Sequence, residues 1–391
     1  MGRVRANLRS FHRRAEAAGV EVRPHVKGHR MPDVARLQGR KVALTSAAEA
    51  GPYLEMGVDD VVVAYPWREP WRWRLFARLA ARCRTSVHVD CLDAVHGLAA
   101  DAASAGTQVG IRVEVNTGYG GRGVTPAEAP RLAQAAARAP GLRLEGVTGY
   151  AGPGTESELR SRFTIGHHHA TTLVSIAQAL RRQGLPCPVV CAGGTPTAAG
   201  AMSVHGITEV VAGAYALGDA GLAAAGFCAF SDVAISVHPT AAPLLDGCAQ
   251  EWSTPSDTTT SPLHTHHATT STPTTSTPTT TSTSNSTSTI ATSTIAASAT
   301  ATSAATSTST STAAASTTGS LRRHRPDDQS GPQADPSLLV QGAPPEGCRA
   351  DGWLLPGHVC ALVLKVRRVL AVDGTEVVGE WPVVRVPDQE G

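Results

Sequence analysis

Lys27 lies at the end of a short segment, Val20 to Val26, whose alternating apolar residues predict a β-strand. Arg23, His25 and His29 surround this lysine within seven residues. A lysine amine at the end of a strand can form a Schiff base with an aldehyde cofactor. A solvated surface lysine is the alternative, and this segment taken alone leaves both interpretations open.

A second segment that can do chemistry runs from Cys191 to Thr197 and contains Gly194 and Thr195. Backbone amides of a glycine-rich turn and threonine hydroxyls can bind an anion, and barrels hold phosphate groups near their later strands. The segment Gly213 to Tyr215 follows the next predicted strand and can complete such an anion site. An ordinary turn between a strand and a helix is the alternative.

His358 and Cys360 are two residues apart in a segment, Trp353 to Cys360, that we expect to be a strand. In a strand both side chains would point to the same face. An imidazole and a thiolate on one face are plausible zinc ligands. Two ligands suit an open, catalytic site that also binds water or substrate, and a buried cysteine beside an exposed histidine is the alternative.

The elements that must position these residues follow a regular alternation over the first 252 residues. The expected strands are 20–26, 42–45, 58–64, 86–90, 108–115, 144–150, 188–191 and 208–212, and the expected helices are 5–18, 34–37, 47–56, 71–83, 94–105, 127–139 and 159–184. This alternation predicts an α/β fold, a closed (β/α)₈ TIM-like barrel with a parallel sheet. Because chemistry in such barrels lies after the strands, Lys27 and Gly194 fall where a site is expected.

The composition divides the chain into four parts. We expect the barrel at 1–230, the start of a small β domain at 231–252, a Ser/Thr-rich insert at 253–335, and the rest of the β domain at 336–391. The dipeptide Asp373-Gly374 between apolar runs predicts a hairpin in the last part. The insert has too few large apolar residues to fold and is predicted to be disordered, although a frameshift or a wrongly assigned exon would give the same pattern.

Charge and cysteine usage exclude several classes of protein. The net charge of +2 provides no basic field for nucleic acid, and no run of about 18 apolar residues predicts a membrane span. The charged first residues do not resemble a signal peptide. The eight cysteines contain no C-x-x-C pair, which favours reduced thiols, and we expect a soluble cytoplasmic protein.

Together these segments resemble the D-threonine aldolase and D-serine dehydratase family, which consists of alanine racemase-like, fold-type III pyridoxal-phosphate enzymes. Residues 23–38 read R-P-H-V-K-G-H-R-M-P-D-V-A-R-L-Q and are similar to the cofactor-lysine segment of that family. The similarity continues through residues 45–49, 88–90, 146–152, 192–197, 208–219, 356–360 and 381–385.

This resemblance implies a role for each candidate residue. Lys27 would bind pyridoxal 5'-phosphate and then remove a proton from the substrate. The other cofactor contacts would be Tyr150, Gly194, Thr195, Tyr215 and Arg122, and the Zn²⁺ ligands would be His358 and Cys360. The family also implies a small-molecule D-amino acid substrate and a homodimer. The charge and the apolar runs of the chain predict no nucleic-acid or membrane partner.

The His-x-Cys pair resembles the dehydratase branch, whereas aldolases tend to carry His-x-Asp. The resemblance therefore implies conversion of D-serine to pyruvate and ammonia, with zinc acting as a Lewis acid on the substrate hydroxyl. A D-threonine aldolase-like lyase that forms glycine and acetaldehyde is the second interpretation. A catalytically impaired relative that binds pyridoxal phosphate without turnover is the third. A racemase would need a second base on the opposite face and no zinc.

Four departures from the family pattern keep the impaired relative among these alternatives. Arg122 comes one position later than the arginine of the family, and Pro153 stands where the family has a histidine. The Ser/Thr tract replaces a segment that normally contains a Glu-His pair. The chain also begins within what resembles the first helix, so a preceding strand is expected to be absent.

Overall fold

The structure is a computed structural model that describes residues 1–118, 122–152, 161–237, 338–340 (backbone only), 355–356, 358–373 and 376–385. The predicted insert at 253–335 lies outside these residues, as does the departure at Pro153. The start of the predicted β domain, 231–252, is described only as far as residue 237.

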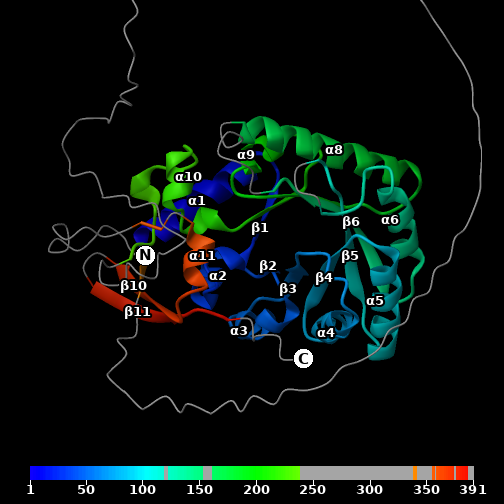
Figure 1. The fold of residues 1–391 in the computed structure, drawn as a ribbon, viewed down its shortest axis with the longest axis horizontal. Coiled ribbons are helices and arrows are strands. Elements are labelled where there is room, and N and C mark those ends of the chain that lie inside the picture. The colour runs from blue at the N-terminus through cyan, green and yellow to red at the C-terminus, as the bar shows by residue number, and fades with distance from the viewer. Residues whose placement is uncertain are drawn as a thin grey trace, which may run out of the picture. The chain divides into compact units, whose positions relative to one another are not determined.

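Eight parallel strands form a nearly closed barrel (Figure 1). They are β1 Glu21–Pro24, β2 Lys41–Leu44, β3 Asp60–Val63, β4 Arg84–Val89, β5 Val109–Glu114, β6 Leu142–Tyr150, β7 Val189–Gly193 and β8 Glu209–Ala212. Their order is β1-β8-β7-β6-β5-β4-β3-β2, so β1 and β2 must meet to close the barrel. An isolated parallel bridge between His25 and Ala43 joins them, and the predicted (β/α)₈ architecture is confirmed.

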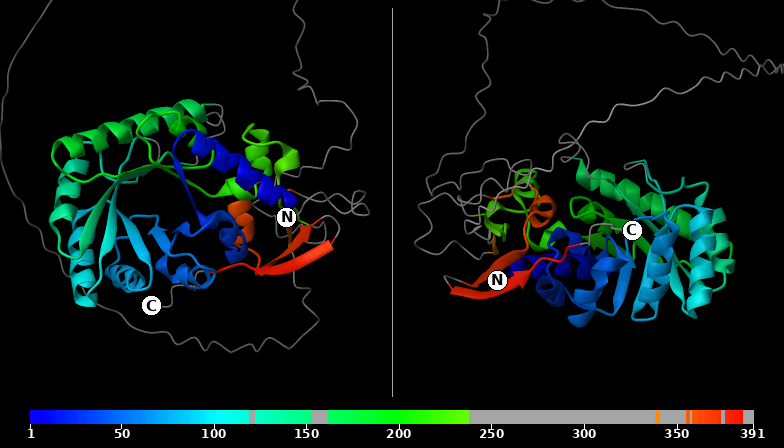
Figure 2. Two further views of the ribbon diagram at one scale, coloured as in Figure 1. Left: turned by 180° about the vertical axis from the view of Figure 1, so that it is seen from behind. Right: turned by 60° about the horizontal axis from the view of Figure 1, so that its bottom comes forward.

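Helices on the outside of the barrel cover the strands (Figure 2). They are α1 Gly2–Ala17, α2 Pro32–Gln38, α3 Ala50–Glu55, α4 Pro70–Ala80, α5 Leu92–Ala105, α6 Ala129–Arg138, α8 Arg162–Arg182 and α9 Ala198–Met202, and the short helix α10 Ala220–Ala224 follows β8. Helical spacing of apolar residues places one face of each long helix against the barrel, as Ala129, Leu132, Ala133 and Ala136 show in α6.

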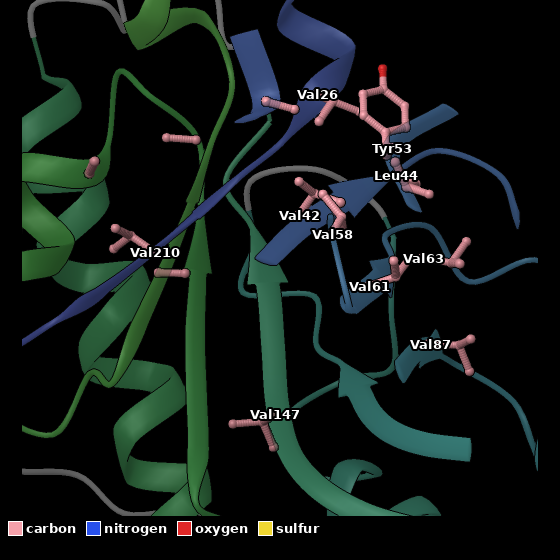
Figure 3. Packing of buried hydrophobic residues seen from close by; sticks show 14 of the residues in the cluster. Val26, Val42, Leu44, Tyr53, Val58, Val61, Val63, Val87, Val147 and Val210 are labelled. Carbon is pink, nitrogen blue, oxygen red and sulfur yellow. The ribbon is translucent and has the colours of Figure 1, made fainter. Parts of the chain in front are cut away.

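The two faces of the strands belong to different parts of the core. Val42 and Val61 pack in the large cluster between the barrel and its helices (Figure 3). Their neighbours Ala43 and Val62 point the other way and belong to a small separate cluster with Cys191. This separation follows from the two-residue period of a strand, and it leaves little apolar material to fill the barrel interior.

Charged residues fill part of the interior. Arg23 on β1 binds Glu209 on β8 through Nε at 2.8 Å and Asp60 on β3 through Nη1 at 2.9 Å. Arg112 on β5 binds the same Glu209 and reaches Glu145 on β6 at 3.3 Å. Burial by itself would raise the pKa of Glu209, but Arg112 and Arg23 outweigh burial and lower it to about 2.

The C-terminal region contains a small sheet and a short helix. Strand β10 (Arg368–Asp373) pairs antiparallel with β11 (Glu376–Pro382), which confirms the predicted hairpin, and parallel with β9 (Leu338–Val340). The strand predicted at Trp353 to Cys360 is wrong at its end, because Val359–Val363 forms helix α11. Its buried residues Val359, Leu362 and Val363 have the spacing of a helix rather than the alternation of a strand.

Within the described part of the chain, no helix is long and apolar enough to cross a membrane.

Candidate active site

A cavity of about 490 Å³ opens at the carboxyl ends of the barrel strands. Residues from β1, β3, β4, β5, β6, β7 and β8 or from the turns after them line it, together with α10 and the start of α11. Of the eight predicted site residues, it contains Lys27, Arg122, Tyr150, Gly194, Thr195, His358 and Cys360. This is the end of the barrel at which a site was predicted.

Lys27 enters the cavity from a 3-10 turn, Val26–Gly28, that directly follows β1. Its Nζ donates a hydrogen bond to the Tyr65 hydroxyl at 3.0 Å and lies 5.6 Å from the centre of the Tyr150 ring. Burial by itself would lower the pKa of Lys27, but the interactions with Tyr65 and Tyr150 outweigh it, and the pKa is raised. Both aromatic rings therefore hold the lysine amine in place.

Two glycines let the lysine turn pack against the turn after β8. A Cβ on Gly28 would lie 2.6 Å from the Gly213 carbonyl carbon, and one on Gly213 would lie 2.7 Å from the His25 carbonyl oxygen. Any side chain at either position would push the two backbones apart. These glycines thus fix the place at which Lys27 enters the cavity.

A buried dyad lies across the barrel from the lysine. His88 on β4 and Glu114 on β5 line the cavity, and His88 Nδ1 lies 3.0 Å from Glu114 Oε2. His25 also lines the cavity, and burial, reinforced by the charge of Lys27, holds its pKa well below the ordinary value. Analysis of the sequence did not single out His88 or Glu114 as site residues, although both lie near the carboxyl ends of predicted strands, which was the available signal.

The predicted phosphate turn provides one clear hydrogen-bonding group. Gly194 adopts a φ of +111°, and its amide donates to the Val211 carbonyl at 2.8 Å, so its amide is already used within the barrel. Thr195 Oγ1 is buried and has no hydrogen-bond partner among the described residues. A buried hydroxyl of this kind needs an acceptor or donor, which a phosphate oxygen would supply. Gly194 provides the backbone conformation of the turn, and the Thr195 hydroxyl is the group that can bind a phosphate oxygen.

Tyr215 lies behind the cavity rather than in its wall. Its ring stacks on Phe11 with centroids 4.3 Å apart, and its hydroxyl accepts a hydrogen bond from Gln38 Nε2 at 3.1 Å. Its neighbours Gly213 and Ala214 line the cavity instead. The predicted contact of Tyr215 with the cofactor remains a prediction, and the position of the ring supports the turn that borders the cavity.

His358 and Cys360 meet in this cavity although α11 replaces the expected strand. His358 Nδ1 lies 3.4 Å from Oδ2 of Asp219, and the interactions with Asp219 and Cys360 raise the pKa of His358 to about 10. Asp219 is buried and accepts backbone hydrogen bonds from Val359 at 3.1 Å and Leu222 at 2.7 Å. A carboxylate on Nδ1 would orient the imidazole and leave Nε2 for a metal ion.

The donor set fits a metal ion with open coordination positions. An imidazole and a thiolate are ligands that zinc prefers. No group of three or more His, Cys, Asp or Glu residues in the described ranges is arranged to hold a metal. Asp219 was not predicted as a site residue, although it follows directly on the turn after β8.

The comparison with known families agrees with the fold and the cavity. The model of the alanine racemase N-terminal domain matches residues 1–221 of this chain. The chain therefore belongs to the family of that domain. The domain is the barrel of the fold-type III pyridoxal-phosphate enzymes.

Two curated proteins are similar to this chain over much of its length. The chain is 32% identical over 250 residues to D-threo-3-hydroxyaspartate dehydratase of Delftia sp. (strain HT23), covering 61% of this chain and 65% of the relative. It is 32% identical over 223 residues to D-threonine aldolase of Arthrobacter sp., covering 55% and 58%. These matches span less than two thirds of the length of either relative.

Solved structures give the same picture. The Delftia dehydratase superposes with a TM-score of 0.54 at 30% identity, covering 61% of this chain and 65% of that chain. The D-threonine aldolase from Filomicrobium marinum superposes with a TM-score of 0.53 at 27% identity, covering 61% and 67%.

Proposed function

We propose that this protein is a pyridoxal-phosphate-dependent, zinc-assisted lyase that converts D-serine to pyruvate and ammonia. One observation carries the proposal: Lys27, Thr195 and the pair His358 and Cys360 line a single cavity of about 490 Å³, although more than 300 residues separate the lysine from the pair. An amine, an unpaired hydroxyl and a nitrogen–sulfur metal pair in one cavity are the groups that this chemistry requires.

The residues of the cavity fit the cofactor. Lys27 would hold its aldehyde carbon, Thr195 would bind its phosphate, and Tyr150 would lie beside it. Bound pyridoxal phosphate would draw electrons from the substrate Cα and so acidify the hydrogen on that carbon. Lys27 Nζ is then the base that accepts this proton, and the Tyr65 hydroxyl, 3.0 Å from Nζ, orients it.

His358 and Cys360 would hold the zinc ion that assists departure of the substrate hydroxyl. Hydroxide leaves Cβ poorly, and a zinc ion on the substrate hydroxyl would make it a better leaving group. Solved structures of D-threo-3-hydroxyaspartate dehydratase include a cysteine-to-alanine variant in the metal-free form and a histidine-to-alanine variant, and the histidine precedes the cysteine by two residues. His358 and Cys360 have the same order and spacing, which supports a metal at this place.

The first test is pyruvate release from D-serine by the purified protein with added pyridoxal phosphate, before and after EDTA. We expect release that EDTA abolishes and that added zinc restores. Lys27→Ala should lose both the visible absorbance of the bound cofactor and the activity, because it removes the amine. Arg40→Gln is a matched control, since Arg40 is exposed and pairs with Asp59 at the opposite end of the barrel.

A D-threonine aldolase-like activity is the second candidate, favoured by the 32% identity to the Arthrobacter aldolase. D-threonine should be run in parallel and assayed for both glycine and 2-oxobutyrate. Glycine without pyruvate from D-serine would replace the dehydratase proposal with the aldolase. Visible absorbance without any product would instead favour a relative that binds the cofactor without turnover.

A further inference from the structure

A chain of four hydrogen-bonding side chains begins directly after the turn that contains Lys27. Its first member is His29, which is fully buried. Burial lowers the pKa of His29 to about 4, so the ring is neutral at pH 7. His29 Nδ1 accepts a hydrogen bond from the Met31 amide at 3.0 Å. The ring hydrogen is therefore on Nε2, which donates to Gln38 Oε1 at 2.9 Å.

Gln38 and Tyr215 continue the chain in the same direction. Gln38 accepts through Oε1, and its Nε2 donates to the Tyr215 hydroxyl at 3.1 Å. Because the hydroxyl oxygen accepts this bond, its own hydrogen is left to donate to His12 Nε2, 3.1 Å away. His12 is half-buried and is the last acceptor. It can accept this hydrogen only while its imidazole is neutral.

The four residues come from elements at the place where the barrel closes. His29 follows β1, Gln38 ends α2, and β1 pairs with β8. Tyr215 lies in the 3-10 turn after β8, and His12 lies on α1. The chain thus connects the turn of Lys27 to the turn after β8 and to the first helix, and its directional bonds favour one arrangement of these elements.

We propose that this chain positions the Lys27 amine for the cofactor, and that Tyr215 and His12 are positioning residues of the candidate active site. The inference rests on the proposed role of Lys27 in holding pyridoxal phosphate. It adds a role for the Tyr215 hydroxyl, which acts on the lysine turn through Gln38 and His29. It also makes α1 part of the site, although no residue of α1 lines the Lys27 cavity.

Protonation of His12 would break the chain at its outer end. The added hydrogen on Nε2 would point at the Tyr215 hydroxyl, whose own hydrogen would then have no acceptor in the chain. Burial lowers the pKa of His12 from its ordinary value of 6.5, so the imidazole is neutral at pH 7 and becomes charged only below pH 6.5. Binding of the cofactor should therefore respond to the protonation of a residue outside the cavity.

The charged groups around His12 leave burial as the cause of this shift. Helix α1 packs on β1 and on the turn after β8. The ionisable side chains of these elements near His12 are Arg9, Glu16, Glu21, Arg23 and Tyr215. Those of β1 form ion pairs with other strands. Those of α1 lie about one helical turn before and after His12 and have opposite charges.

The first test measures cofactor affinity. Tyr215→Phe removes the hydroxyl and keeps the ring that stacks on Phe11. We expect it to raise the Kd of pyridoxal phosphate about 3- to 10-fold at pH 8, the effect of losing one buried hydrogen bond. Titration of the cofactor-free protein, followed by the absorbance of the lysine-bound cofactor, gives this Kd. Tyr53→Phe is the matched control, because Tyr53 is buried and its hydroxyl has no hydrogen-bond partner among the described residues.

Substitutions of His12 separate a positioning role from packing. His12→Gln keeps an acceptor that does not titrate, whereas His12→Leu removes the acceptor. At pH 8 we expect His12→Leu to lose as much affinity as Tyr215→Phe, and His12→Gln to lose less. From pH 8 to 5.5 the Kd of the wild type should rise more steeply than that of His12→Gln, because the cofactor phosphate and the other histidines titrate in both proteins. Equal pH profiles would overturn the role of His12.

The direction of the chain can be tested without cofactor. Donation from the Tyr215 hydroxyl stabilises the neutral imidazole of His12, so Tyr215→Phe should raise the pH at which this ring titrates in NMR spectra. The resonance that is missing from His12→Gln identifies His12. Exposed His96 on α5 should titrate at the same pH in both proteins. An unchanged or lowered midpoint for His12 would overturn the inferred chain.

The outcomes separate the two proposals. If the wild type binds no pyridoxal phosphate at pH 8, the proposed lyase function fails, and the NMR titration decides whether the chain exists. If the cofactor binds, and Tyr215→Phe binds it as tightly as the wild type does, only the positioning role of the chain fails.

Discussion

Glu209→Gln is the substitution that most directly tests the charged interior of the barrel. Glu209 begins β8, is almost fully buried, and accepts hydrogen bonds from Arg23 and Arg112. Glutamine has the same shape and removes the negative charge. Two buried guanidinium groups would then lose their shared counter-ion directly beneath the Lys27 cavity.

Two arguments give the free energy of unfolding that Glu209→Gln should remove. A pKa of about 2 instead of the ordinary 4.5 corresponds to about 3 kcal/mol of stabilisation by Glu209 at neutral pH. Removal of one partner from a buried ion pair costs up to about 3–5 kcal/mol, and the lower end applies here because Arg23 keeps Asp60 and Arg112 keeps Glu145 as partners. We therefore expect Glu209→Gln to lower the free energy of unfolding by about 3 kcal/mol at pH 7.

The same reasoning fixes the pH dependence. Because folding lowers the pKa of Glu209, its contribution is complete above about pH 4.5 and is lost as the pH falls towards 2. The variant lacks this contribution at every pH. Urea denaturation followed by circular dichroism at pH 7, 5, 4 and 3.5 should thus show a difference between the two proteins that shrinks below pH 4.5.

Glu21→Gln is the matched control. Glu21 is the register partner of Glu209 on β1, but its side chain is 46% exposed and pairs with the exposed Lys41. An exposed ion pair contributes about 0–1 kcal/mol, so this variant should be close to the wild type. The reasoning would be refuted by a loss below 1 kcal/mol for Glu209→Gln, by equal losses in both variants, or by a difference that stays constant down to pH 3.5.

Three further substitutions test the site. Gly213→Ala places a Cβ 2.7 Å from the His25 carbonyl oxygen; it should destabilise the protein by about 1–3 kcal/mol in thermal melts and weaken the absorbance of bound pyridoxal phosphate. Asp219→Asn removes the charge that faces His358, and zinc titration should show affinity lowered about 10- to 100-fold. Cys360→Asp replaces a soft ligand with a hard one, and elemental analysis should show less bound zinc relative to manganese.

The barrel could be predicted from the sequence because its periodicity is local. Residues 61–64 form an apolar run, apolar residues alternate with others over residues 108–115, and glycines such as Gly106, with a φ of +62°, end helices. The order of strands and helices then defines the class of fold. The position of Lys27 after β1 followed from the same pattern, since the lysine ends a strand.

The parts that were missed depend on contacts between distant segments. Nothing near His358 in the sequence indicates that Asp219, 139 residues earlier, would meet its imidazole. The helix at Val359 to Val363 was mistaken for a strand because a run of five residues is too short to separate the two periods. Tyr65 gave no signal either, because its contact with Lys27 depends on a backbone φ of +139°, which no residue type encodes.

The charges of the cavity favour an anionic cofactor. Each of its two buried acids faces an imidazole, Glu114 that of His88 and Asp219 that of His358. Lys27 and Arg122 have no such acidic partner among the residues that the structure describes, and their charged groups lie 5.4 and 4.6 Å from the centre of the Tyr65 ring. Two cations in a partly enclosed cavity repel each other unless a ligand supplies negative charge. A cofactor phosphate would supply that charge, so the cofactor should bind more weakly as salt concentration rises.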